Sequence, residues 1–339
     1  MKATLIRAIA LVVSLIPGVA LGQPFVDQLG LTPRFPSTAP PPNRTPETLT
    51  GNDLRVSSLQ TDSTGGLWIG SWRSLARINP NTGQVVAEVD LPNYTISALA
   101  QDRVGRIWLG TYEGLLRVDP RSNEVTAQNI TLPSNRVLSL LVDRRGFLWV
   151  GTDQGLALVS PDEGLLMTTW RSLPGRSGNA MTLDRQGQLW VGTQEGLVRI
   201  DTASAMPLAR VADLPGAMVQ ALATHGRDGT IWAGTPSGLV VVDPNLGRVS
   251  RVVNSMRDRN VTALRFANDG SLWVGTDNGL WRIDPTGGAI LDQVPQLPSS
   301  QIFALSPDTG NKLWIGTGLG LAWRGADGEV RPHVGLNSR

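Results

Sequence analysis

Three aromatic side chains in expected loops between strands could bind a ligand. They are Trp72, Tyr94 and Tyr112, and the two tyrosines are the only ones in the chain. Flat aromatic rings offer a large contact area at low entropy cost, and tyrosine keeps a polar tip for hydrogen bonding. Such side chains suit a sugar ring, which has CH groups on its faces and hydroxyls at its rim. An extended peptide suits them as well, and the sequence does not choose between the two.

Charged side chains accompany these aromatics at equivalent places in a repeated pattern. Together they form the expected ligand-binding set: Trp72, Arg73, Tyr94, Tyr112, Glu113, Arg136, Asp153 and Asp277. These positions vary from repeat to repeat while the residues around them stay the same. Variation of this kind is typical of binding loops carried on a rigid frame. Loop tips that nothing constrains would vary in the same way.

Other kinds of site have little support in the sequence. There are two histidines, His225 and His333, which we expect at the surface, and there is no cysteine. Neither histidine has the spacing of a metal ligand, so no metal site and no cofactor is expected. Nucleophile-elbow and phosphate-loop motifs are absent from the sequence. Carboxylates recur with the repeat, which favours a role in capping turns over catalysis or calcium binding.

One phrase, LWVGTDNGLWRIDP at residues 272–285, organises the whole chain. Related copies place tryptophans 40 to 42 residues apart, at Trp68, Trp108, Trp149, Trp190, Trp232, Trp273 and Trp314. Self-similarity at such a period indicates a repeat architecture. Each unit contains four short apolar runs separated by Gly, Pro and Asp clusters, which predicts four strands joined by tight turns. A glycine three residues before most of the tryptophans would supply the positive φ of the first turn.

The tryptophan strand is apolar on both faces, so each small sheet needs a neighbour on both sides. A ring satisfies this need, and the predicted fold is therefore all-β, a seven-bladed β-propeller of about 41-residue, four-stranded repeats over residues 51–335. We expect each blade to be contiguous in sequence, with its first strand innermost. Residues 329–334 should supply the outer strand of the last blade, and residues 24–31 are the alternative.

The N-terminus has the features of an export signal. Lys2 and Arg7 precede an apolar run too short to span a membrane, and small residues follow it, so residues 1–22 are predicted to be a signal peptide cleaved near Gly22. Residues 23–50 form a proline-rich linker, and residues 336–339 a tail. Without Lys2 and Arg7, 28 of the 30 basic side chains remain, against 28 acidic ones. This balance favours neither nucleic acid nor anionic lipid as a partner, and no membrane span is expected.

The phrase at 107–120, 189–201 and 272–285, with its preceding Asp-x-x-Gly turn and the linking residues 132–137, resembles the two-component regulator propeller repeat. The resemblance covers residues 51–335. It implies an extracytoplasmic sensor propeller, of the kind usually joined to a membrane helix and a histidine kinase in polysaccharide sensing. Since neither follows residue 339, we expect recognition without signalling output by this chain. Residues 78–84 are also similar, more weakly, to the streptogramin lyase group.

In a propeller, the loops between second and third strands share one face with the linkers between blades. We call this the loop face, and the opposite one, which carries the repeated Asp turns, the turn face. The expected function is a periplasmic or secreted monomer that binds a carbohydrate or peptide on its loop face. One alternative is a scaffold that binds an envelope protein. Another is a lyase-type propeller enzyme, which would need a general acid and base in the central funnel.

Overall fold

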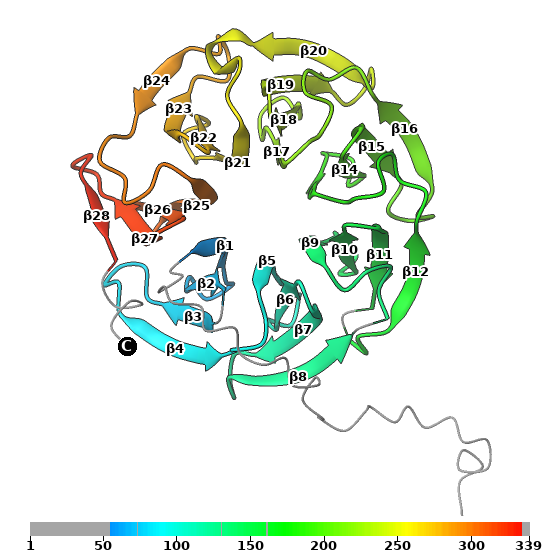
Figure 1. The fold of residues 1–339 in the computed structure, drawn as a ribbon, viewed down its shortest axis with the longest axis vertical. Helices are drawn as coiled ribbons and strands as arrows, with labels where there is room; N and C mark the ends of the chain where they lie inside the picture. Colours follow the sequence, from blue (N-terminus) through cyan, green and yellow to red (C-terminus); the bar gives the residue numbers. More distant parts are fainter. Residues whose placement is uncertain (1–54, 73, 130, 161, 334–339) are drawn as a thin grey trace, which may run out of the picture. The chain divides into compact units, whose positions relative to one another are not determined.

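The computed structural model describes residues 55–333 apart from Arg73, Ile130 and Pro161. The predicted signal peptide, the linker, the tail and the alternative strand at 24–31 lie outside these residues. Seven four-stranded antiparallel sheets stand around a central axis, and each is built from consecutive strands (Figure 1). The prediction of an all-β, seven-bladed propeller is confirmed.

Blades one to four follow the repeat in order along the chain. Blade one holds β1 (Val56–Thr61), β2 (Leu67–Ser71), β3 (Ser74–Ile78) and β4 (Val85–Asp90). Blade two holds β5 (Ile96–Gln101), β6 (Ile107–Thr111), β7 (Gly114–Asp119) and β8 (Glu124–Asn129). Blade three holds β9 (Val137–Val142), β10 (Leu148–Thr152), β11 (Gly155–Val159) and β12 (Leu166–Trp170). Blade four holds β13 (Ala180–Leu183), β14 (Leu189–Thr193), β15 (Gly196–Ile200) and β16 (Pro207–Val211).

Blades five to seven complete the ring. Blade five holds β17 (Ala221–Thr224), β18 (Ile231–Thr235), β19 (Gly238–Asp243) and β20 (Arg248–Val253), followed by a short 3-10 turn, η1 (Asn254–Met256). Blade six holds β21 (Val261–Phe266), β22 (Leu272–Thr276), β23 (Gly279–Ile283) and β24 (Ile290–Gln293). Blade seven holds β25 (Ile302–Thr309), β26 (Lys312–Thr317), β27 (Gly320–Arg324) and β28 (Val330–Pro332). The predicted outer strand of the last blade is thus β28.

The tryptophan of each second strand fills the space between neighbouring blades. Six of the seven are at most 1% exposed, and Trp273 is 6% exposed. Each packs with apolar residues of an adjacent blade; Trp68, for example, lies in one cluster with Leu99 and Leu109 of blade two. The glycine two residues after each tryptophan lets the blades approach closely. A Cβ added at Gly151 would lie 2.2 Å from the carbonyl oxygen of Gly178 in the next linker.

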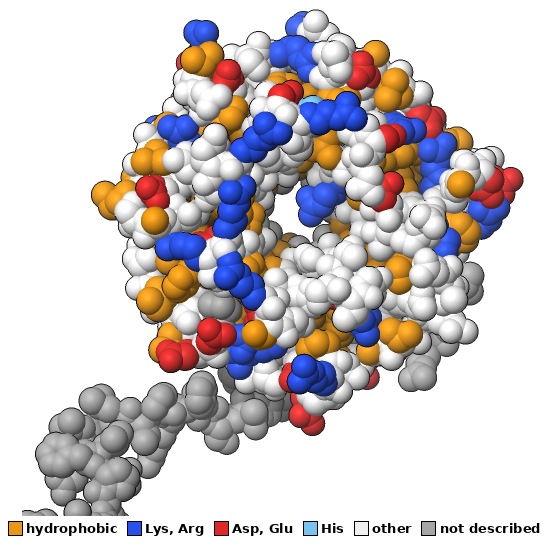
Figure 2. Space-filling model, turned by 180° about the vertical axis from the view of Figure 1, so that it is seen from behind, with side chains coloured by type: hydrophobic (Ala, Val, Ile, Leu, Met, Phe, Trp, Pro, Cys, Tyr) orange, Lys and Arg blue, Asp and Glu red, His pale blue; other side chains and the backbone are white. Residues whose placement is uncertain are grey.

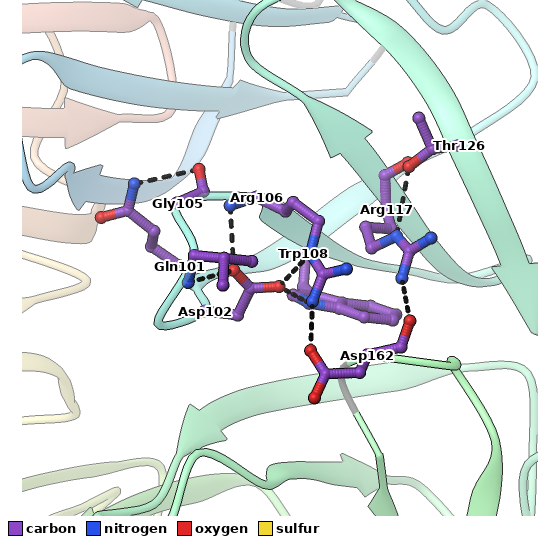
Figure 3. A network of polar contacts seen from close by, with 9 residues as sticks. Gln101, Asp102, Gly105, Arg106, Trp108, Arg117, Thr126 and Asp162 are labelled. Atoms are coloured by element: carbon purple, nitrogen blue, oxygen red, sulfur yellow. Dashed lines mark hydrogen bonds and ion pairs between the residues drawn. The ribbon is translucent and has the colours of Figure 1, made fainter.

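The turn carboxylates fix the tryptophans in place, as Figure 3 shows for blade two. One oxygen of Asp102 accepts from the backbone amides of Val104 and Arg106, which closes the β5–β6 turn. The other accepts from the Trp108 indole nitrogen at 3.1 Å and from Arg106 Nε at 2.7 Å. A carboxylate in this position satisfies a buried indole and the turn amides together. The predicted capping role is confirmed here.

The same arrangement recurs in blades one, three and four. There the indole nitrogen donates to Asp62, Asp143 or Asp184 at 3.0 to 3.1 Å. Blade seven differs, because its indole donates to the carbonyl oxygen of Thr309, while Asp308 accepts from the backbone amide of Asn268 in blade six. Asp308 therefore differs from the turn carboxylates of blades one to four, since β25 runs on to Thr309 and places the Asp308 carboxylate at the neighbouring blade.

The Asp62 carboxylate gives the fold a dependence on pH. Burial would raise its pKa, but hydrogen bonds from Thr64, Arg77 and two backbone amides outweigh burial and hold the pKa below its ordinary value. A depressed carboxyl pKa stabilises the fold above the unfolded pKa of about 3.9, and the benefit is lost as the pH falls through the folded pKa. Asp62→Asn should therefore be less stable than wild type near neutral pH. In urea unfolding the difference should shrink below about pH 4; a constant difference down to about pH 3 would contradict this assignment.

Candidate functional site

On the loop face, the linker between blades one and two meets the β6–β7 loop. The backbone amide of Thr95 donates to Glu113 Oε2 at 2.8 Å, and the amide of Tyr112 donates to the Thr95 carbonyl at 3.1 Å. Tyr94 lies partly buried against the blade-two core, and its hydroxyl accepts from Gln128 Nε2 at 3.2 Å. These contacts place the expected residues Tyr94, Tyr112 and Glu113 in one neighbourhood.

Arg136, from the linker between blades two and three, joins this neighbourhood. Its guanidinium lies 4.7 Å from the centre of the Tyr112 ring, within the range of a cation–π contact. The Tyr112 side chain is 40% exposed, so part of the ring faces solvent. We call Tyr94, Tyr112, Glu113 and Arg136 the tyrosine cluster.

Trp72 takes part in a different set of contacts. It follows β2 and is partly buried rather than fully at the surface. The Arg55 guanidinium lies 4.4 Å from its ring and 5.1 Å from the ring of Phe303 in β25. Trp72 therefore belongs to the junction between blades seven and one, and no contact links it to the tyrosine cluster within the described residues. Its neighbour Arg73 lies outside those residues.

Asp153 and Asp277 occupy equivalent loops in blades three and six. The amide of Asp153 donates to the carbonyl of Arg136 at 3.2 Å, which connects this loop to the tyrosine cluster. Asp277 accepts from Asn260 Nδ2 at 3.2 Å and stands among the loops of blade six. The expected set thus divides into a group of five around Tyr112 and two separate loops, those of Trp72 and Asp277.

The two histidines are buried, so their expected surface position is wrong. His225 is 8% exposed, with its Nδ1 atom 2.8 Å from Asp228 Oδ1 and its ring against Phe266. His333 is 6% exposed, and its Nε2 atom lies 2.6 Å from the carbonyl oxygen of Gly83 in blade one. His333 therefore helps to join the last blade to the first, a role that depends on ring closure.

Polar side chains of the innermost strands tie each blade to the next around the axis. Ser57 donates to the carbonyl of Ile96 at 2.5 Å, and Ser97 donates to that of Val137 at 2.7 Å. Equivalent bonds from blades three to six follow: Ser139 to Gly178, Asn179 to Val219, Gln220 to Asn260 and Thr262 to Ile302. In blade seven the corresponding residue is Phe303, whose ring lies 5.1 Å from the Arg55 guanidinium at the junction with blade one.

These inner strands enclose a central cavity of about 180 Å³. Most of the side chains that line it are small or neutral, and Arg265 of β21 is the one charged residue among them. The Arg265 side chain is exposed to the opening, and desolvation by the surrounding walls lowers its pKa. Arg265 was not among the expected site residues, because it lies in an inner strand and not in a varying loop. Polar residues such as Ser57, Ser97 and Thr262 recur in the innermost strands, and this recurrence is a signal in the sequence for the wall of the cavity.

Within the described part of the chain, no group of three or more His, Cys, Asp or Glu residues could hold a metal ion. The same residues include no helix long and apolar enough to cross a membrane. The geometry is that of a rigid ring with a cluster of aromatic and charged side chains on one face.

Comparison with known proteins supports the repeat assignment. The model of the family described as two component regulator propeller matches residues 90–113, 131–154 and 255–278. None of the curated proteins matches the chain.

Several solved structures share the fold. One is the extracellular domain of BT4673 from B. thetaiotaomicron, named as a hybrid two component system, with 21% identity and a TM-score of 0.68 over 81% of this chain and 38% of that one. The corresponding domain of BT3049 from the same organism gives 19% identity and a TM-score of 0.65, over 80% and 40% of the two chains. The chain thus spans about two fifths of the length of these relatives.

Virginiamycin B lyase from Staphylococcus aureus is also similar, with 15% identity and a TM-score of 0.68 over 80% of this chain and 94% of the lyase. At such identities the likeness concerns the fold alone. The chain is thus a seven-bladed propeller in which three segments match the two component regulator propeller model.

Proposed function

We propose that this chain is an exported, sensor-type recognition module that binds a carbohydrate or an extended peptide on its loop face, around the tyrosine cluster. The proposal draws on the family and on similar solved structures that are extracellular domains. A periplasmic or secreted location and a cleaved signal peptide at residues 1–22 form part of it, as does a monomeric state.

The observation that carries the proposal is the partly exposed Tyr112 ring beside Arg136 and Glu113. The ring is 40% exposed, and the guanidinium lies 4.7 Å from its centre. Glu113 is held by the Thr95 amide, so a cation, an anion and an aromatic surface are presented from fixed backbone. Such a combination can stack on a sugar face and bond the hydroxyls at its rim, or receive a peptide with mixed side chains.

A thermal-shift screen of neutral oligosaccharides and peptides would identify the ligand. A ligand present at about 100 times its dissociation constant adds about 2.7 kcal/mol of stability, which is readily detected. Calorimetric titration of the ligand would then locate the site. Tyr112→Ala should weaken binding about 10- to 30-fold, as expected for an aromatic anchor.

Gln194→Ala is a suitable control, because Gln194 is exposed at the equivalent position of the β14–β15 loop in blade four. It should bind like wild type. Binding that survives Tyr112→Ala but is abolished by Asp284→Ala without unfolding would place the ligand on the turn face and refute the proposal.

An enzyme remains the less favoured candidate. The lyases with this fold are 15% identical to the chain. Both histidines, the residues best suited to acid–base catalysis near neutral pH, are buried, and His333 is engaged at the junction of the ring. The scaffold alternative predicts capture of an envelope protein with no effect of Tyr112→Ala on small-ligand binding.

A further inference from the structure

Four exposed arginines occupy the same repeat position on the turn face. Each stands five residues before its tryptophan, in the first turn of blades two to five: Arg103, Arg144, Arg185 and Arg227. The other three blades have Ser63, Asn268 and Thr309 there. Since equivalent positions of successive blades lie at successive angles around the axis, the four form an arc. Figure 2 shows basic side chains gathered in an arc beside the central opening.

The next blade orients three of the four arginines of this arc. Arg144 Nη2 donates to the carbonyl of Asp184 at 3.2 Å, and Arg185 Nη2 donates to that of Gly226 at 2.6 Å. Arg227 Nη2 donates to the carbonyl of Asp269 at 3.4 Å. These bonds use one terminal nitrogen of each guanidinium. A guanidinium has five N–H donors, so several remain for a ligand while the side chain is already held in place.

No ion pair involves an arginine of this arc within the described residues. The carboxylates of the same turns have other partners: Asp102 pairs with Arg106 and Asp143 with Arg145. Asp184 accepts from the Trp190 indole nitrogen and from the backbone amides of Gln186 and Gln188. Asp228, beside Arg227, pairs with His225. The arc is therefore a local excess of positive charge on a chain that has almost as many acidic as basic side chains overall.

Arg265 adds a fifth positive charge at the same end of the ring. It is the last residue but one of β21, next to the turn that follows this strand, and it lines the central cavity. Figure 2 shows basic side chains on more than one side of the central opening. The Arg265 Nη1 atom donates to the carbonyl of Leu264 at 3.1 Å, and Arg265 forms no ion pair with a carboxylate among the described residues. A recess with walls of one charge concentrates the field at its mouth.

We propose that the turn face binds an acidic peptide segment of a partner protein. One carboxylate of the segment enters the mouth of the central opening and meets Arg265, while the flanking carboxylates pair with the arginines of the arc. Guanidinium and carboxylate groups form paired, charge-assisted hydrogen bonds, which suit this chemistry. The concentric arrangement favours a protruding peptide over a flat anionic membrane, since a flat surface cannot reach a charge inside the opening. This surface is separate from the loop face, and the proposal does not depend on the ligand proposed there.

The test measures binding of a short, fluorescently labelled oligoglutamate by anisotropy at low and at physiological salt. The triple variant Arg144→Gln, Arg185→Gln, Arg227→Gln should bind at least about 10-fold more weakly than wild type. Arg265→Gln should also weaken binding, because it removes the central charge and leaves the arc intact. The affinity of wild type should fall as the salt concentration rises.

The matched control is Arg171→Gln, Arg176→Gln, Arg257→Gln, which removes the same charge from exposed linker positions on the loop face. It should bind oligoglutamate within about twofold of wild type. If both triple variants lost affinity for oligoglutamate equally, the effect would be one of net charge alone and the proposal would be overturned. So would the absence of binding at low salt, or unchanged binding by Arg265→Gln.

Two further measurements keep the test decisive. Because three arginines of the arc bond the next blade, a triple variant that fails to fold is replaced by Arg103→Gln, whose contact with the next turn is the packing of its Cδ atom near Gly146. Dextran sulfate serves as the competing chemistry. The partner is not an acidic peptide if dextran sulfate binds wild type more tightly than oligoglutamate does and if only the arc variants weaken this binding. In that case Arg265→Gln would bind dextran sulfate like wild type. If this proposal fails, the expected result of the Tyr112→Ala experiment on the loop face stays the same.

Discussion

Trp149→Ala is expected to lower the free energy of unfolding by about 3–5 kcal/mol, as large-to-small changes in a core do. Trp149 is 0% exposed and stacks on Trp170 with ring centres 5.4 Å apart. It also packs with Leu189 and Val191 of blade four, so the change leaves a cavity between two blades. Urea unfolding followed by circular dichroism measures the loss.

Trp170→Ala is the matched control, because Trp170 is partly exposed in the outer strand β12 of the same blade. It removes the other half of the same stacked pair without opening the space between the blades. It should cost clearly less, about 1–2 kcal/mol. Equal losses would mean that the stacked pair, and not the packing between blades, accounts for the stability.

Asp143→Ala should cost about 3 kcal/mol, although it removes few atoms. The Asp143 side chain is 0% exposed. One oxygen accepts from the amides of Arg145 and Phe147, and the other accepts from the Trp149 indole at 3.1 Å. Each buried donor left without an acceptor costs about 1–3 kcal/mol, and Arg145, which is partly exposed, can turn to solvent. Chemical denaturation of the variant tests this value.

Two comparisons separate this network from ordinary turn capping. Asp201→Ala removes a carboxylate that accepts from the amides of Ala203 and Ser204 in an outer turn, without any indole, and it should cost about 1 kcal/mol. In the double variant Trp149→Ala, Asp143→Ala, the loss should be smaller than the sum of the two single losses, because the indole that needed the carboxylate is gone. Strict additivity would show that the two side chains act independently.

Much of the fold follows from local chemistry that the sequence displays. The tryptophan period predicts the number of blades, and the apolar character of both strand faces predicts that they close into a ring. Gly65, Gly105 and Gly146 adopt positive φ values of 83°, 93° and 97°, as the turn preceding each tryptophan strand requires. Asp102 caps its turn because its carboxylate lies two to four residues from the amides it accepts. Interactions within one repeat can be predicted from the sequence because the residues involved are close in sequence.

Part of the candidate site was equally accessible to sequence reasoning. Tyr112 and Glu113 stand in one loop, and Tyr94 and Thr95 stand in the adjoining linker, so their meeting requires only the geometry of one blade. The indole–carboxylate bond was not predicted, although its signal was present. Asp and Trp recur six residues apart in four blades, with the indole donating across that interval.

The tertiary structure alone decided what happens between blades, because those contacts join residues a full repeat or the whole ring apart. Trp72 has the sequence features of a loop-face ligand residue, yet ring closure brings Arg55 and Phe303 to it. His333 is buried because Gly83, 250 residues away, lies against it. Arg265 faces the cavity because β21 is the innermost strand of its blade. The structure of one blade follows from the spacing of residues within one repeat. The contacts between blades follow from closure of the ring, which depends on all seven blades together.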